Sequence, residues 1–370
     1  MPIFKEKIQT ALSKIDIEIN GTRPWDIEVH DERLYQRIVL RGSIGLGEAY
    51  VDGWWDCKKL DEFFYKMLRA RLHVSHKAVG QDLFHYLSNI FNRQTVKRSL
   101  EVGERHYDIG NDLYQAMLDK RMVYTCGYWK NASNLDEAQE AKLDLICKKL
   151  NLKAGDKVLD IGCGWGSFAK FAAEKYGAHV TGITISKEQV ALGKELTKGL
   201  PVEIKFLDYR NIEGVFDHIV SIGMFEHVGH RNYRTFMNVV SQHLKDDGIF
   251  LLHTVGENFS GISTDPWTDK YIFPNGSVPT IKQIGEAIES IFVIEDLHNF
   301  SDDYDKTLMA WQKSFNGHWG ELGKKYSKRF YRMWNYFLLS FAGAFLARDN
   351  QLWQIVLTKG GLKEGYNSIR

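Results

Sequence analysis

One stretch decides the fold of this 370-residue chain, Val158-Leu-Asp-Ile-Gly-Cys-Gly-Trp-Gly166. Its apolar start is typical of a buried strand, and glycines follow at three alternate positions, 162, 164 and 166. Because glycine has no Cβ, such a turn lets the backbone approach a ligand closely. The spacing is GxGxG, whereas the dinucleotide fingerprint is GxGxxG and places a pyrophosphate at a helix start. The stretch therefore predicts a nucleoside-binding loop and disfavours an NAD site, with a tight structural turn as the alternative.

Helical and extended patterns alternate on both sides of this loop. The amphipathic run LDEAQEAKLDLICKKL precedes it, and SFAKFAAEKYG, HVTGITI, KEQVALGKELTKG and VEIKFLD follow it as helix, strand, helix and strand. Further along come the extended run FDHIVSIG, a helix near YRTFMNVVSQHL and the extended run GIFLLHTV. This alternation predicts a doubly wound α/β domain with a parallel sheet, whose ligand lies at the carboxyl ends of the strands.

The first 90 residues have a different pattern. Two short runs, IDIEINGT and DIEVHD, have the period of two that is typical of strands, and helical patterns stand beside them. Residues 76–105 combine an amphipathic piece with basic residues and predict a helical connector. We expect a small mixed α/β domain over residues 1–90 and a larger domain over residues 91–370.

Composition and charge exclude several classes of protein. Hydrophobic residues make up 44% of the chain and charged residues 26%, which is ordinary for a globular protein. The formal net charge is +1, so the charge balance gives no reason to expect nucleic acid as a partner. The four cysteines show no metal-ligand spacing and suit a reducing cytosol. We expect a cytoplasmic protein with no metal site and no nucleic-acid partner.

Two segments bear on targeting and membrane insertion. Residues 1–20 lack the continuous apolar core and cleavage site of a signal peptide, and they have the pattern of an amphipathic helix. Residues 333–347 are apolar, but they are interrupted by Asn335 and Ser340 and are shorter than the roughly 20 residues that span a bilayer. We expect no transmembrane segment.

The glycine loop, preceded by VLD and followed by an aromatic residue, resembles the first motif of the class I methyltransferases that use S-adenosylmethionine (SAM). In that family an acid usually ends the second strand and holds the ribose, but this chain has Thr184 and Ser186 there, with Gln189 following. The resemblance implies that SAM binds the loop. The loop residues implied to contact it are Asp160, Gly162, Cys163, Gly164, Trp165 and Gly166.

The chain is similar to the cyclopropane synthases, including the mycolic acid enzymes. The features that it shares with them are the absence of this acid and the presence of Cys126, Glu226 and His253. Six blocks that resemble this family occur in its order: GSIGLGEAYVDGWWDC, HYDIGNDLY, MVYTCGYW, GMFEHVG, DPWTDKYIFPNG and LMAWQKSF. The resemblance covers nearly the whole chain. It implies a class I SAM-dependent methyltransferase fold. We expect the small N-terminal domain to govern lipid access, because a nucleotide site does not need it. The resemblance also implies transfer of a methylene group from SAM to the cis double bond of unsaturated acyl chains in membrane phospholipids.

Further SAM contacts are implied by the same resemblance. They are Thr184 and Gln189 at the ribose or methionine, Asp208, Tyr209 and Arg210 at the adenine, and Tyr124 and Thr125 at the methionine end.

The resemblance also implies a bound bicarbonate as the base, held by Cys126, Glu226, His253, Tyr304 and the backbone near Val255. An anion caged by hydrogen-bond donors and a carboxyl group can stay oriented beside a developing cation without trapping it covalently. Each residue also has a structural interpretation. Glu226 could cap a helix, His253 could be a core histidine, Cys126 a small buried hydrophobe and Tyr304 an exposed loop residue.

Aromatic residues make up 13% of the chain, which is typical either of deep apolar cavities or of an aromatic-rich core. Trp267, Tyr271, Phe273 and Trp311 are candidates to line an acyl tunnel and to stabilise a cation through their π faces, with plain packing as the alternative. Some relatives have a cysteine just before AGAF, where this chain has Phe341. If the chemistry holds here, that thiol cannot be essential.

The run KKYSKRFYRMWNYF, residues 324–337, has the composition of a basic amphipathic segment at a membrane interface. A charged face over a core helix is the alternative. We expect a homodimer that associates reversibly with the inner face of the membrane and takes unsaturated phospholipid there. Two other functions remain open: a SAM-dependent fatty acid methyltransferase that leaves a methyl or methylene branch, and a catalytically inactive lipid-binding protein.

Overall fold

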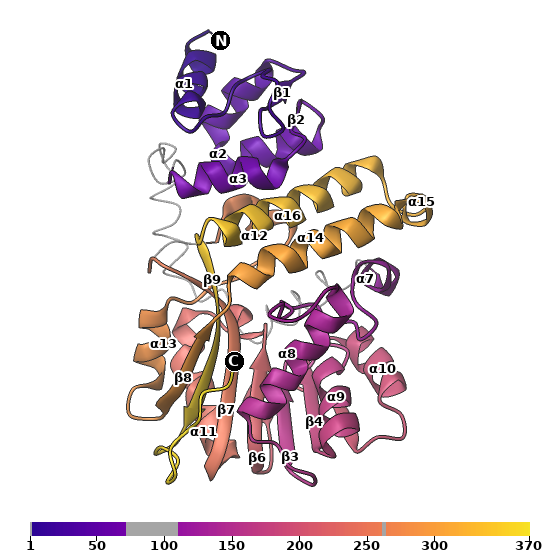
Figure 1. Cartoon of the computed structure of the whole chain (residues 1–370), viewed down its shortest axis with the longest axis vertical. Helices are drawn as coiled ribbons and strands as arrows, with labels where there is room; N and C mark the ends of the chain where they lie inside the picture. The colour runs from indigo at the N-terminus through magenta and orange to yellow at the C-terminus, as the bar shows by residue number, and fades with distance from the viewer. Residues whose placement is uncertain (1, 72–109, 261–263) are drawn as a thin grey trace. The chain divides into compact units, whose positions relative to one another are not determined.

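The computed structural model describes residues 2–71, 110–260 and 264–370 (Figure 1). The chain divides into two compact units. The first holds residues 1–91, 263–274 and 304–350, and the second holds residues 92–262, 275–303 and 351–370. The first unit thus adds two later segments to the predicted N-terminal domain. The predicted connector over residues 76–105 lies outside the described residues.

The second unit is built on a seven-stranded sheet in the order β5-β4-β3-β6-β7-β9-β8 (Figure 1). Strands β3 to β7 pair in parallel, and β8 pairs antiparallel with β9, so the predicted parallel α/β sheet is confirmed. The strands are β3 (Lys157–Ile161), β4 (His179–Thr184), β5 (Val202–Phe206), β6 (Phe216–Ile222), β7 (Leu244–Glu257), β8 (Val293–Asn299) and β9 (Asn350–Thr358).

Helices cover both faces of this sheet because its strands are apolar on both faces. Successive strand residues point to opposite faces, and Leu159 belongs to one buried cluster while Val158 belongs to another. The first cluster includes residues of α11 and α13, and the second includes residues of α8 and α9. The helices of this unit are α7 (Asn111–Met117), α8 (Leu135–Lys149), α9 (Ser167–Tyr176), α10 (Lys187–Leu196), α11 (Tyr233–His243) and α13 (Ile281–Ile288), with 3-10 turns η1 (Tyr209–Asn211), η2 (Phe225–His227) and η3 (His230–Asn232).

Local sequence sets where these helices begin. The side chain of Asn134 accepts a hydrogen bond from the N–H of Glu137 at the start of α8. Ser186 caps α10 in the same way, and Thr280 forms a capping box with Gln283 at the start of α13. These caps satisfy backbone N–H groups that have no partner within the helix.

The first unit is mainly helical. It holds the helices α1 (Pro2–Ser13), α2 (Arg33–Val51), α3 (Leu60–Arg69), α12 (Pro266–Tyr271), α15 (Trp319–Leu322) and α16 (Lys328–Leu346), almost all of α14 (Asp302–Gly317), and the two-residue strands β1 (Glu28–Val29) and β2 (Trp55–Asp56). Helix α16 packs closely on α3, because a Cβ added at Gly343 would lie 2.5 Å from the carbonyl oxygen of Asp61. The predicted N-terminal helix is confirmed as α1. In the described part of the chain, no helix is long and apolar enough to cross a membrane.

Candidate active site

The glycine loop links β3 to α9 and has a backbone that favours glycine. Its three glycines have φ of 82°, 57° and 81°, in the left-handed region. A Cβ added at Gly162 would lie 2.5 Å from the Cβ of Met224, whereas no described atom lies within 4 Å of a Cβ added at Gly164. The N–H groups of residues 162 and 163 donate to the carbonyl oxygen of Ile183 at 2.9 and 3.0 Å. The loop is therefore anchored to β4 and open at Gly164.

Two side chains beside the loop are held in the protein interior. Asp160, in β3, is 1% exposed, and its burial raises the pKa of its carboxyl group to about 7. The Nε1–H of Trp165 donates to Oδ1 of Asn111 at 3.2 Å, and its ring centroid lies 5.2 Å from that of Tyr114. The Trp165 side chain thus fixes the loop to α7.

Three predicted polar residues come together where β4 ends. The hydroxyl of Thr184 donates to Oε1 of Gln189 at 2.6 Å and accepts from the N–H of Ser186 at 3.3 Å. All three side chains are buried. Polar groups that could form hydrogen bonds with ribose hydroxyls are therefore present at the end of β4, where an acid would be expected.

The predicted adenine residues lie after β5. Asp208 is held by Arg210, whose guanidinium donates to both carboxylate oxygens at 2.7 and 2.6 Å. The ring of Tyr209 is buried, with its centroid 5.2 Å from that of Phe236. Of these residues, Asp208 and Arg210 present polar groups at this strand end, while Tyr209 packs into the core.

Thr125 lies against the carboxyl end of β6, since a Cβ added at Gly223 would be 2.6 Å from its Cγ2. Two residues of α8 hold it: Lys142 Nζ donates to its Oγ1 at 2.8 Å, and Gln139 Nε2 donates to its carbonyl oxygen at 2.7 Å. Lys142 is 1% exposed, and burial lowers the pKa of its ammonium group to about 8. The neighbouring Tyr124 packs its ring 5.1 Å from that of Tyr114.

Glu226 sits in η2, directly after β6. The N–H of Val255 donates to its Oε1 at 2.6 Å, so the predicted backbone group fixes the carboxyl group. Its Oε2 is buried and has no hydrogen-bond partner among the described residues. Burial raises the pKa of this carboxyl group to about 7. Glu226 therefore presents one oxygen that can carry a proton and donate it to a ligand.

His253 lies on β7, opposite Ile222 at the end of β6. It is 1% exposed, and its Nε2 is buried without a partner in the described part of the chain. Burial, followed by the charges of Lys142 and Lys149, holds the pKa of the imidazole well below its usual range. The ring is therefore neutral. Nδ1 lies 3.3 Å from Nε2 of Gln354, on the neighbouring strand β9.

The other two predicted cage residues belong to different units. Cys126 lies in the second unit, is fully buried, and its Sγ lies 3.1 Å from the carbonyl oxygen of Gly127. Tyr304 lies in the first unit, where its ring centroid is 4.3 Å from that of Phe345 and 6.1 Å from that of Trp311. The second unit thus contains Glu226, Val255, His253 and Cys126, and the first unit contains Tyr304.

The predicted acyl-lining aromatics belong to the first unit. Trp267 is 2% exposed, and its ring centroid lies 4.5 Å from that of Tyr336 and 5.5 Å from that of Tyr271. Phe273 packs against Phe341, with ring centroids 6.1 Å apart. Aromatic side chains of α16 therefore pack on Trp267 of α12 and on Phe273, which follows that helix.

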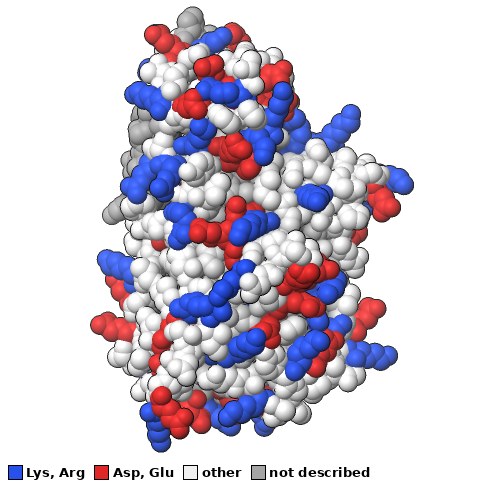
Figure 2. Space-filling model, in the orientation of Figure 1, with Lys and Arg blue, Asp and Glu red and all other residues white. Residues whose placement is uncertain are grey.

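The basic run is less available to a membrane than its composition suggests. Arg332 donates to Asp56 at 2.7 Å, and Arg329 binds Asp52. Trp334 is fully buried and stacks on Phe330 at 5.5 Å, so it contributes to the core. On the face shown in Figure 2, basic and acidic side chains of the described residues are interspersed.

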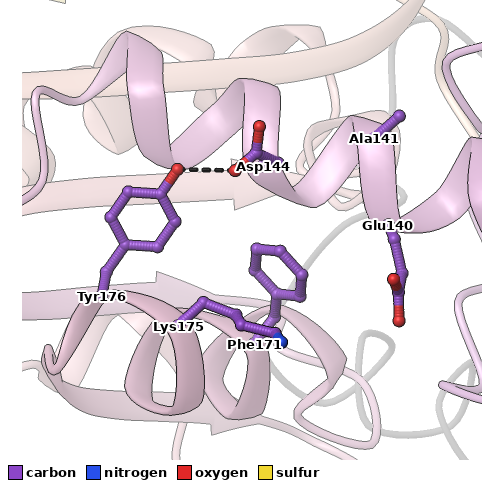
Figure 3. Close-up of a pocket in the computed structure, with 6 residues that line it drawn as sticks. All are labelled: Glu140, Ala141, Asp144, Phe171, Lys175 and Tyr176. Atoms are coloured by element: carbon purple, nitrogen blue, oxygen red, sulfur yellow. Dashed lines mark hydrogen bonds between the residues drawn. The ribbon is translucent and has the colours of Figure 1, made fainter. Parts of the chain in front are cut away.

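A surface hollow lies between α8 and α9 (Figure 3). Tyr176 donates to Asp144 there at 2.6 Å. None of its six lining residues is a predicted site residue; they are Glu140, Ala141, Asp144, Phe171, Lys175 and Tyr176.

Three residues that the sequence did not single out belong to the candidate site: Gln139, Lys142 and Gln354. Their signal in the sequence is a polar side chain within an apolar pattern. Gln139 and Lys142 stand three residues apart on α8, and Gln354 interrupts the apolar run of β9.

Comparison with known proteins defines first the class and then the family. The cyclopropane synthase MmaA2 from Mycobacterium tuberculosis matches with a TM-score of 0.67 and 29% identity, over 70% of this chain and 98% of that one. Mycolic acid cyclopropane synthase CmaA1, in complex with SAH and CTAB, matches with a TM-score of 0.66, 29% identity and coverage of 70% and 98%. The fold is that of the class I SAM-dependent methyltransferases.

The family follows from sequence. Residues 94–355 match the model of the mycolic acid cyclopropane synthetase family. The cyclopropane-fatty-acyl-phospholipid synthase of Escherichia coli K12 is 51% identical over 350 residues, which cover 94% of this chain and 92% of that protein. This chain belongs to the mycolic acid cyclopropane synthetase family.

Proposed function

We propose that this protein transfers a methylene group from SAM to the cis double bond of unsaturated acyl chains in phospholipids, and so forms cyclopropane fatty acids. The observation that carries the proposal is the pair of buried polar atoms at the strand ends, Glu226 Oε2 and His253 Nε2. Both atoms belong to residues that the sequence singled out for the site, and both lie at the carboxyl ends of β6 and β7 or directly after them. Family membership and the SAH complex of CmaA1 support SAM as the methyl donor.

The chemistry requires a dry, aligned site. An alkene carbon attacks the methyl carbon of SAM, the C–S bond breaks with its electrons on sulfur, and a cation develops on the other alkene carbon. The same methyl carbon then loses a proton, and the ring closes. The open loop at Gly164 supports a donor site in the second unit, and the aromatic residues around Trp267, in the first unit, are the proposed apolar and π surfaces for the acyl chain.

The residues at the strand ends fit a bicarbonate ion. When bound, bicarbonate supplies a base for the proton that leaves the transferred methyl group. A carboxyl group that carries a proton can donate from Glu226 Oε2, and a neutral imidazole can donate from His253 Nε2. Val255 holds Glu226 in place through its N–H. We further propose that Cys126 and Tyr304 complete the cage.

The reaction can be tested directly by incubating the protein with SAM and vesicles of unsaturated phospholipid. Mass analysis of the fatty esters should show the addition of one CH2 without a remaining double bond. An ester of the same mass that can still be hydrogenated would indicate a methylene branch and would replace the cyclopropane assignment with that of a fatty acid methyltransferase. No change in mass would leave only the inactive lipid-binding protein.

The affinity for bicarbonate should weaken as the pH rises through about 7. The pKa of Glu226 is raised to about 7, so the protonated donor form prevails below that pH and a second negative charge appears above it. At a fixed bicarbonate concentration, the apparent affinity for bicarbonate should fall between about pH 6 and about pH 8.5. Glu226→Gln serves as the control, since its amide does not titrate. An equal fall in that variant would assign the pH dependence to another group.

We also propose reversible association with the membrane surface, in which the exposed Lys324 and Lys328 contribute to binding. Lysines near an anionic surface contribute about 1 kcal/mol each. Replacing both by glutamate should therefore weaken sedimentation with anionic vesicles roughly tenfold or more. Lys194→Glu with Lys198→Glu, on exposed positions of the second unit, is the charge-matched control. Equal losses in the two double variants would reject a specific role of the basic run. The predicted homodimer is a separate proposal.

A further inference from the structure

Gln354 occupies an unusual position for an amide. It lies within β9, between the buried residues Trp353 and Ile355, and it is 0% exposed. A polar side chain in such a place costs stability unless it forms a hydrogen bond. Its Nε2 lies 3.3 Å from Nδ1 of His253, and both residues belong to the second unit. The family's implied site residues do not include Gln354.

In the orientation of the Gln354 amide, Nε2 faces His253 and Oε1 has no partner among the described residues, so the contact selects which nitrogen of His253 carries the hydrogen. A neutral imidazole has one N–H, and an amide nitrogen can only donate. Where Nε2 of Gln354 donates to Nδ1, that nitrogen must present its lone pair, so the hydrogen lies on Nε2 of the imidazole. Burial and the nearby charges of Lys142 and Lys149 keep the ring neutral, so a second hydrogen does not obscure this choice.

Nε2 of His253 is also the ring nitrogen that the protein leaves open. It is buried and has no partner among the described residues, as is also true of Glu226 Oε2. A hydrogen on Nε2 makes this atom a donor, which an anion needs. With the opposite tautomer, Nε2 would present a lone pair that cannot donate to the charged oxygens of the anion and could only accept from the bicarbonate O–H.

We propose that Gln354 is a positioning residue: it donates to Nδ1 of His253 and thereby places the imidazole hydrogen on Nε2, where it binds the anion. This inference rests on the bicarbonate site proposed above. The anion's charge is then met by two donors whose protonation the protein itself sets, Glu226 through burial and His253 through Gln354.

The experiment measures the tautomer and anion binding separately. In the full chain labelled with 15N-histidine, long-range 1H–15N correlation spectra show which ring nitrogen of His253 carries the hydrogen, and His253→Ala identifies the signal. We expect the hydrogen on Nε2. In Gln354→Glu the new carboxylate accepts from Nδ1, so the hydrogen should move there. Titration with sodium bicarbonate, followed by the same signals, should show affinity at least tenfold weaker than that of the unaltered chain.

Two further variants keep the test decisive. Gln351→Glu puts the same charge on a buried residue of the same strand, where Oε1 accepts from Asn299 at 2.9 Å, and it should leave the tautomer and bicarbonate affinity of His253 unchanged. Gln354→Met removes the donor without adding charge, and it should also weaken bicarbonate affinity. This variant replaces Gln354→Glu in the test if Gln354→Glu does not fold.

The outcomes separate this inference from the proposed function. A hydrogen on Nδ1 in the unaltered chain would overturn the role of Gln354, as would unchanged bicarbonate affinity in Gln354→Met. If the tautomer is as expected but bicarbonate does not perturb His253 in the unaltered chain, the bicarbonate site is overturned, and the assignment of the hydrogen to Nε2 stands.

Discussion

Replacing Gly164 by valine is expected to abolish SAM binding in a protein that still folds. Gly164 has φ of 57°, and no described atom lies within 4 Å of an added Cβ. The side chain would therefore enter the open space at the strand end, where the nucleoside is expected to bind. A β-branched residue in the left-handed region also costs about 1 to 2 kcal/mol and would shift the loop. Isothermal calorimetry should show no SAM binding.

The control uses the same substitution at the other end of β3. Gly155 has φ of 86° and open space around an added Cβ, but it precedes the strand. Gly155→Val should lose a similar amount of thermal stability and bind SAM normally. Unchanged SAM affinity in folded Gly164→Val would show that the loop does not hold the nucleoside, and lost affinity in both variants would assign the effect to general destabilisation.

The sheet could be predicted because its pattern is local. Most of the parallel strands contain a short apolar run bounded by turns, and amphipathic helices follow β3 and β4, as the sequence indicates between residues 135 and 257. The N-terminal strands were predicted less well. The run IDIEINGT has the period of a strand, but the carboxylate of Asp26 accepts hydrogen bonds from the N–H groups of Glu18 and Arg23. Backbone donors bound by a side chain are lost to strand pairing, so the segment closes as a loop.

The position of β9 could not be predicted from the sequence. The last strand inserts between β7 and β8, and only this order brings Gln354 beside His253, 101 residues earlier. Nothing in the local pattern of β9 indicates its neighbours. The residues that follow β3, β4 and β6 were easier to find, since the carboxyl ends of parallel strands lie at one edge of the sheet.

The basic run shows a second limit of composition. Its sequence indicated free cations and interfacial aromatics, but the partners of Arg329 and Arg332 lie more than 270 residues away, at Asp52 and Asp56. Ion pairs at such a separation leave no periodic signal. We therefore propose that the exposed lysines of the run contact the membrane surface. Trp334 is buried and belongs to the core.

Removing either buried donor of the strand-end site should cost as much as removing both. Glu226→Ala and His253→Ala each delete one of two groups that hold a single anion, and groups that act as a unit lose their effect together. Each variant should raise the activation free energy that corresponds to kcat by roughly 2 to 4 kcal/mol. The double variant should be little worse than either single variant. SAM affinity should barely change, because neither unpaired atom belongs to the glycine loop.

His218→Ala provides the matched truncation for this cycle. His218 is half-buried near the start of β6 and pairs with Val158 near the start of β3, so its loss should affect stability and not kcat. Activity should be measured on unsaturated phospholipid vesicles, with bicarbonate first removed and then restored. Removal should slow the unaltered protein, and added bicarbonate should partly restore Glu226→Gln by mass action. Because proton removal follows methyl transfer, weakened binding of bicarbonate should also release methylated alkenes without a ring.

Three outcomes would each reject a shared anion site. They are additive losses in the double variant, a large loss of SAM affinity in either single variant, and unchanged activity of the unaltered protein after rigorous bicarbonate removal.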